Sequence, residues 1–140
     1  MNRCFTDGAW REDGLAAGMG WRIESNRKIF VGQGSKVMDF VKSPLMAEAL
    51  AIRFALNHAL ELGLETICIA SDAYELIRVL NLGQNRTEIF EILHDIYKLS
   101  SQFLDVAFIF IPRETNLVAD SLAKQYLHAL SMVSEINPSV

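Results

Sequence analysis

The stretch MNRCFTDGAW, residues 1–10, places an acid, Asp7, directly behind a short apolar run and in front of Gly8. An acid in this position either opens a turn with the glycine or presents a ligand where a strand ends. The stretch alone leaves both interpretations open. The choice depends on whether other carboxylates, further along the chain, meet Asp7 in space.

The composition of the 140-residue chain is typical of one globular domain, with 51% hydrophobic and 21% charged residues, and it excludes a disordered chain. We expect a single domain over residues 1–140, with a frayed tail at 131–140 where the apolar period is lost. No apolar run approaches the roughly 20 residues of a membrane helix, and the first residues lack the apolar segment of a signal peptide. We therefore expect an intracellular protein, of the nucleus or cytosol, with no membrane partner.

The net charge of −4 argues against tight, nonspecific binding of nucleic acid, which usually requires a basic face. It leaves open an enzyme that acts on nucleic acid, because a local basic patch can exist within a negative total. Cys4 and Cys68 lie in apolar strand-like segments and are interpreted as buried free thiols rather than a disulfide. Neither has a neighbouring Cys or His at the spacing of a zinc site.

The first part of the chain indicates strands followed by a helix. Strands are expected at residues 3–6, 19–23 and 29–34, and a polar turn joins the last two as a hairpin. Ser43 and Pro44 then begin a helix, as an N-cap hydroxyl and a first-turn proline. One apolar stripe runs along this helix until Gly63 ends it.

The rest of the chain alternates strands and helices. The expected elements are a strand at 66–70, a helix at 73–80, a helix capped by Thr87, a strand at 106–111 and a final helix capped by Thr115 or Asn116. Crossovers of this kind favour parallel pairing, whereas the early hairpins favour antiparallel pairing. The sequence therefore predicts an α/β domain, with helices packed on a mixed sheet.

Four acids lie at the ends or borders of these expected elements. Asp7 and Asp72 follow apolar strands, and parallel pairing of the two strands would bring both acids to the sheet edge where ligands bind in such folds. Glu48 and Asp120 border the apolar stripes of their helices and should face the sheet margin. Each also has an ordinary alternative: a turn for Asp7, a helix cap for Asp72, and solvated helix acids for the other two.

Carboxylates that crowd together resist ionisation unless a cation neutralises them. An all-oxygen ligand set suits Mg²⁺ or Mn²⁺ rather than zinc. Two such ions, roughly 3.5–4 Å apart, form a common arrangement for phosphodiester hydrolysis. If Asp7, Glu48, Asp72 and Asp120 meet in space, we therefore expect them to form a site for two Mg²⁺ or Mn²⁺ ions.

Four segments resemble the ribonuclease H family, and more closely the ribonuclease H-like domains of plant proteins related to retroelement reverse transcriptases. They occur in the family's order and spacing: FTDGAW at 5–10, AEALA at 47–51, ASDAYELI at 70–77 and PRETNLVADSLAK at 112–124. The resemblance implies a ribonuclease H-like fold, a five-stranded mixed sheet with strands one to three antiparallel and helices on both faces. It also implies cleavage of RNA in RNA/DNA hybrids, which such enzymes recognise by the 2′-OH and by duplex shape.

The resemblance also implies roles for individual residues. Asp7 matches the first-strand aspartate that bridges both metals, and the other three acids match the first-helix glutamate, the acid after the fourth strand and the last-helix aspartate. Weaker candidates for substrate binding are Ser43, Arg113 and Asn116. Ser43 could donate to a phosphate, although capping alone explains it. Arg113 could replace a loop histidine of many cellular members or could be a surface cation.

Two departures from the family motivate an alternative function. The loop before the last helix has no histidine, and the segment Gly83–Thr87 carries one charge where several bacterial members have a basic protrusion. The alternative is an inactive ribonuclease H fold that binds nucleic acid or protein. If the chain is instead an active enzyme, the same departures imply that it depends on a fused or associated binding module. A proofreading-type exonuclease is disfavoured, because Ala9 stands where that family carries a second acid.

The sequence also carries aromatic and imidazole side chains with plain structural interpretations. Trp10 and Trp21 lie outside any basic neighbourhood, so we expect core or rim packing rather than base stacking. The three histidines, His58, His94 and His128, all lie in expected helices and are interpreted as ordinary helical residues.

Overall fold

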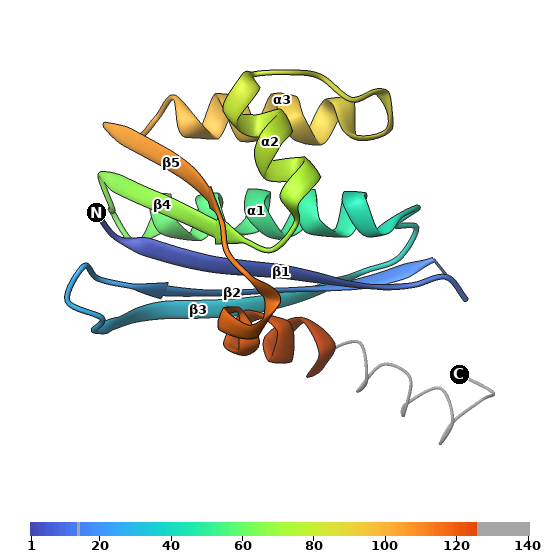
Figure 1. Ribbon diagram of the computed structural model, residues 1–140, viewed down its shortest axis with the longest axis horizontal. Coiled ribbons are helices and arrows are strands. Elements are labelled where there is room, and N and C mark those ends of the chain that lie inside the picture. Colours follow the sequence, from blue (N-terminus) through green and yellow to red (C-terminus); the bar gives the residue numbers. More distant parts are fainter. Residues whose placement is uncertain (14, 126–140) are drawn as a thin grey trace.

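The computed structural model describes residues 1–13 and 15–125 of the chain. Five strands form one mixed sheet in the order β3-β2-β1-β4-β5 (Figure 1). The strands are β1 (Arg3–Arg11), β2 (Ala16–Glu24), β3 (Phe30–Met38), β4 (Thr66–Ser71) and β5 (Asp105–Phe110). The first three pair antiparallel, whereas β4 runs parallel to both β1 and β5. The predicted sheet, with its antiparallel first three strands, is confirmed.

Helices cover both faces of this sheet. The helices that follow β3 are α1 (Pro44–Glu61), α2 (Tyr74–Leu82) and α3 (Phe90–Ser100), and residues 117–125 are also helical. Figure 1 shows α1, α2 and α3 on one face and the last helical segment on the opposite face. The chain therefore forms the three-layer α/β arrangement that the alternating pattern predicts.

Helix α1 begins and ends where the sequence predicts. The Ser43 hydroxyl accepts a hydrogen bond from the backbone N–H of Met46 at 3.1 Å, and Pro44 occupies the first turn. The chain leaves the helix through Gly63, whose φ of +75° is readily available only to glycine. An N-cap of this kind contributes about 1 kcal/mol to helix stability.

The core lies between α1 and the sheet. Met19 and Ile23 of β2, together with Ile52 and Leu56 of α1, are fully buried. Burial of one such side chain stabilises the fold by about 1.5–3 kcal/mol relative to exposure. The rigid contact between α1 and the sheet fixes the helix that carries Glu48.

Some expected boundaries were wrong. β1 continues to Arg11 instead of ending at Thr6, because it keeps pairing with β2 after its ladder with β4 ends. Asp7 therefore lies within a strand, and the interpretation that it marks the end of β1 was wrong. Thr87 does not cap α3: it begins a 3₁₀ turn, Thr87–Ile89, and the structure shows no side-chain cap there.

The other structural expectations are mostly confirmed. Both cysteines are buried and free, and Trp21 is packed in the core, where its indole N–H donates to the Nδ1 of His58 at 2.9 Å. His58 and His94 lie in α1 and α3, while His128 and the tail at 131–140 lie outside the described residues. None of the described helices has the length and apolar character needed to cross a membrane.

Candidate active site

The end of the β1–β4 ladder creates the position of the site. The parallel ladder between β1 and β4 ends at the pair Thr6–Ser71. Asp7 and Asp72 are the residues that directly follow this pair in the two neighbouring segments. Within the described part of the chain, no strand pairs with this edge of β1 beyond Thr6. The parallel register thus brings the two aspartates together, as predicted, although the reason is the end of β4 rather than the end of β1.

Gly8 allows α1 to approach β1 on one face of the sheet. A side-chain carbon at Gly8 would lie 2.6 Å from the backbone carbonyl of Ala47 and 2.8 Å from the backbone nitrogen of Glu48. No real side chain fits at such distances. The glycine behind Asp7 therefore serves close helix packing, and this packing places Glu48 beside Asp7.

Gly20 has the same function on the opposite face. It pairs with Asp7 across the β1–β2 ladder, and a side-chain carbon there would lie 2.5 Å from the carbonyl oxygen of Ala119 and 2.6 Å from the backbone nitrogen of Ala123. The last helix therefore lies directly on β2 beside Asp7. This contact brings Asp120 to the site.

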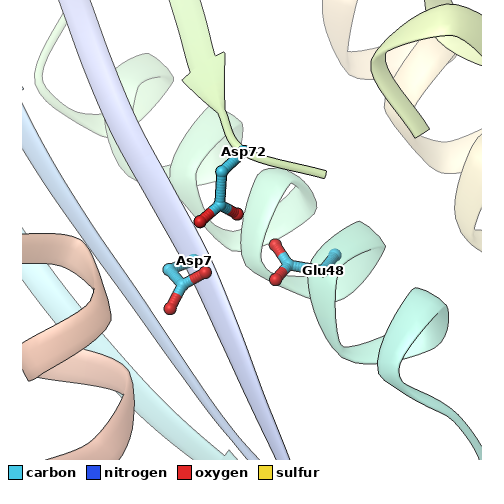
Figure 2. A group of neighbouring side chains, drawn as sticks. All are labelled: Asp7, Glu48 and Asp72. Carbon is cyan, nitrogen blue, oxygen red and sulfur yellow. The ribbon is translucent and has the colours of Figure 1, made fainter. Parts of the chain in front are cut away.

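Three of the four predicted acids form a compact cluster. One carboxylate oxygen from each of Asp7, Glu48 and Asp72 lies within 4.8 Å of the other two. Figure 2 shows the three side chains directed toward one another from β1, α1 and the chain just after β4. Asp7 is also within hydrogen-bonding reach of Asp120, so the fourth acid joins the group through Asp7.

The electrostatics of the cluster favour a bound cation. Burial, with Asp120 as the next cause, raises the pKa of Asp7 from 3.8 to about 7. Burial and the neighbouring Asp7 carboxyl raise the pKa of Glu48 well above its ordinary value. Burial likewise raises the pKa of Asp72, against the opposing effect of Arg113. These acids resist ionisation because too little positive charge lies among them.

Asp120 has a different environment. Burial works to raise the pKa of its carboxyl, but hydrogen bonding with Asp7 and the Lys124 ammonium hold it below the ordinary value. The Nζ of Lys124 lies 3.1 Å from one oxygen of Asp120, and Arg113 lies 4.0 Å from the other. The last-helix acid is therefore already paired with cations, unlike the other three.

The donor set fits a divalent metal ion of the magnesium type. All ligands are carboxylate oxygens, which Mg²⁺ and Mn²⁺ prefer. One oxygen of Glu48, Oε2, is buried without a hydrogen-bond partner. A buried, unpartnered carboxylate oxygen costs free energy unless a cation or proton satisfies it, and its place within the cluster fits a metal ligand.

The four acids line one open cavity of about 490 Å³. Its wall also contains Trp10, Phe110, Arg113 and Lys124. The sequence reasoning had proposed Arg113 as a candidate but missed Phe110 and Lys124. Lys124 follows Asp120 by four residues, the spacing of one helical turn, and this spacing within PRETNLVADSLAK was the available signal.

The three weaker candidates occupy different environments. Arg113 lies on the cavity wall, where 73% of its side chain is exposed. Ser43 caps α1 and lies outside the residues that line the cavity. Asn116 is only 1% exposed and donates its side-chain amide to the carbonyl oxygen of Thr6 at 2.7 Å, so a direct contact with substrate would require it to be uncovered.

Comparisons with known proteins agree with this geometry. The family model described as reverse transcriptase-like matches residues 5–126. RNase H1 from the halophilic archaeon Halobacterium salinarum superposes with a TM-score of 0.85 at 25% identity, covering 91% of this chain and 98% of that chain. A comparison with curated proteins found no match.

Two further solved structures share the fold. The N-terminal RNase H domain of a Mycobacterium tuberculosis protein superposes with a TM-score of 0.86 at 18% identity, covering 95% of this chain and 97% of that chain. LC11-RNase H1 in complex with an RNA/DNA hybrid superposes with a TM-score of 0.81 at 20% identity, covering 89% of this chain and 95% of that chain. The observed five-stranded sheet with helices on both faces is therefore the ribonuclease H fold.

Proposed function

The chain belongs to the reverse transcriptase-like family and is a ribonuclease H domain, and from this premise we propose that it hydrolyses the RNA strand of RNA/DNA hybrids. The reaction is endonucleolytic and depends on Mg²⁺ or Mn²⁺. The observation that carries the proposal is the gathering of four carboxylates in one cavity, three of them within 4.8 Å of one another.

Asp7, Glu48, Asp72 and Asp120 would hold the metal ions in this proposal. Divalent ions in such a site activate water and stabilise the leaving oxygen during phosphodiester hydrolysis. Asp7 lies between the other acids, within reach of both Glu48 and Asp120. Its carboxylate therefore connects Glu48 with Asp120, and its loss should affect every ion that the site binds.

The cavity wall supports a nucleic-acid substrate. Arg113 and Lys124 supply positive charge beside the acids, and cations of this kind attract a phosphate to a pocket that would otherwise repel it. Phe110, with 47% of its surface exposed, packs edge-on against Tyr74, with 5.6 Å between the two ring centroids. Exposed rings beside cations are a common surface for contact with nucleotides.

The proposal for the hybrid itself is supported by the comparison with LC11-RNase H1, which was solved with an RNA/DNA hybrid. The experiment is cleavage of a labelled hybrid by the purified chain in Mg²⁺ or Mn²⁺, with Asp7→Asn as the control. Duplex DNA of the same sequence tests the requirement for RNA. We expect internal cuts in the RNA strand by the wild type only.

Two results would contradict the proposal. Equal, weak cleavage by the wild type and by Asp7→Asn at high protein concentration would remove the catalytic role of the acids. Binding of the hybrid without cleavage in either metal would instead support the alternative, an inactive fold that binds nucleic acid.

A further inference from the structure

Asn116 makes a buried hydrogen bond between distant parts of the chain. Its side-chain Nδ2 donates to the carbonyl oxygen of Thr6 at 2.7 Å, across a separation of 110 residues. Both residues are buried, at 1% and 0% exposure. Buried side chain–backbone bonds of this length hold two elements in fixed register, because water does not compete for either partner.

The two ends of this bond lie beside two different acids of the site. Thr6 directly precedes Asp7 on β1, at the position where the ladder with β4 ends. The backbone carbonyl of Asn116 accepts the N–H of Asp120 at 3.1 Å in the first turn of the last helix. One residue therefore joins the backbone that carries Asp7 to the backbone that carries Asp120.

The other two acids are positioned without Asn116. Asp72 follows β4, which is held by strand pairing on both sides, and Glu48 lies on α1, which packs tightly against Gly8. The last helix, in contrast, meets β2 at Gly20 and β1 through the Asn116 amide. The separation of Asp7 and Asp120 is thus the dimension of the site that Asn116 controls.

We propose that Asn116 is a positioning residue for the half of the site that contains Asp120, and that it does not contact the substrate. The inference rests on the proposed function, because it assigns Asn116 to the spacing of two metal-binding acids. It replaces the expectation that Asn116 binds substrate, since a side chain with 1% exposure and a buried partner is not available to a ligand.

The test compares three variants. Asn116→Ala removes the amide, and Asn116→Asp keeps the size but replaces the donor with an acceptor that faces the Thr6 carbonyl. The matched control is Asn81→Ala, because Asn81 also donates its Nδ2 to a backbone carbonyl, that of Phe108, at 3.0 Å. That bond is exposed and involves none of the four acids.

The first measurement is amide hydrogen exchange, which needs neither metal nor activity. In both Asn116 variants we expect exchange at Gly8 and at residues 119–123 to rise about tenfold or more, while β4 and α1 change little. Asn81→Ala should leave all of these amides unchanged. Equal protection in the wild type and the Asn116 variants would overturn the proposal, and so would loss of the whole fold in both.

The second measurement is calorimetric titration with Mn²⁺, followed by cleavage kinetics. We expect the affinity of the tighter Mn²⁺ ion, which Asp7, Glu48 and Asp72 would hold, to change by no more than about threefold, while the binding of a second ion weakens about tenfold or more. The kcat for the hybrid should fall about 100-fold with KM within about threefold, because positioning affects chemistry rather than binding. A rise in KM alone would indicate direct substrate contact and overturn the proposal.

The two proposals fail in different ways. A wild-type protein that binds no Mn²⁺ would contradict the proposed function, while hydrogen exchange would still decide whether Asn116 couples β1 to the last helix. Normal metal binding and cleavage in Asn116→Ala would contradict only the positioning role.

Discussion

The two halves of the acid cluster differ in how their charge is compensated. Asp7, Glu48 and Asp72 converge within 4.8 Å, and burial raises the pKa of each carboxyl. Asp120 is paired with Lys124 at 3.1 Å and lies 4.0 Å from Arg113, and its pKa is lowered. The protein thus supplies cations to Asp120, whereas the three carboxylates of the first half have no comparable compensation and would be satisfied by protons or by a metal ion.

Under the proposed function, this difference predicts that the two halves bind divalent ions with different affinities. A cluster of uncompensated carboxylates gains most from a divalent ion and should bind it first. A carboxylate that is paired with a lysine must exchange that partner before it contributes fully to a second ion.

Asp7→Asn should have the largest effect, because Asp7 lies within hydrogen-bonding reach of both Glu48 and Asp120 and so connects the two halves. We expect hybrid cleavage to fall at least about 1,000-fold, since Asp7 would be a ligand shared by both ions and its loss should leave the fold intact. Single-turnover cleavage in Mg²⁺ measures this. Residual activity within tenfold of the wild type would show that the reaction does not use this carboxylate.

Gly8→Ala and Gly20→Ala separate the two halves. Each added methyl group would meet backbone atoms at 2.5–2.8 Å, so we expect each variant to lose about 1–3 kcal/mol of unfolding free energy. Gly8→Ala should weaken the binding of the first ion, because it displaces Glu48. Gly20→Ala should leave the binding of the first ion unchanged but impair cleavage. Thermal unfolding and Mn²⁺ titration measure these effects, and identical metal affinities in the two variants would contradict the division.

The pH dependence of stability tests the uncompensated half. Because the pKa of Asp7 is about 7 in the folded chain and 3.8 ordinarily, the folded chain binds more protons than the unfolded chain between these values. The unfolding free energy of the metal-free protein should therefore fall as pH rises from about 4 to about 7, by about 3 kcal/mol from Asp7 alone.

The matched variant for this experiment is Asp7→Asn, which should reduce the dependence, because Glu48 and Asp72 still titrate with raised pKa values. The variant should also be more stable than the wild type at pH 8 without metal. Added Mg²⁺ should raise the unfolding free energy of the wild type at pH 8, because it binds the folded chain. Urea unfolding across this pH range measures both effects. A metal-free wild type that gains stability between pH 4 and pH 7 would contradict the direction of the Asp7 shift.

Lys124→Met should have the smallest effect. Removal of the ammonium beside Asp120 should strengthen the binding of a second Mn²⁺ ion about three- to tenfold and leave the binding of the first ion unchanged. The effect is small because the attraction between partly exposed charges is modest. Lys98→Met, on α3, is the control for loss of a surface lysine. Unchanged titration curves in Lys124→Met would show that the lysine does not compete with metal.

Much of the fold and part of the site could be predicted from the sequence. Asp72 was located by a local pattern, the end of an apolar strand, and Glu48 by its place beside the apolar stripe of α1. Asp7 was selected for the wrong local reason, because the extent of β1 depends on its partner β2 rather than on its own residues. The roles of Gly20 and Asn116 could not be predicted, since each depends on a contact about 100 residues away.

Binding of divalent ions by the acid cluster can be measured by calorimetric titration of Mn²⁺ into the wild type and into Asp7→Asn near pH 7. We predict binding by the wild type with a dissociation constant of about 1 mM or lower, together with proton release, because Asp7 is partly protonated at this pH. Asp7→Asn should bind much more weakly and release fewer protons. Absence of binding by the wild type, or equal binding and proton release by the two proteins, would contradict the account.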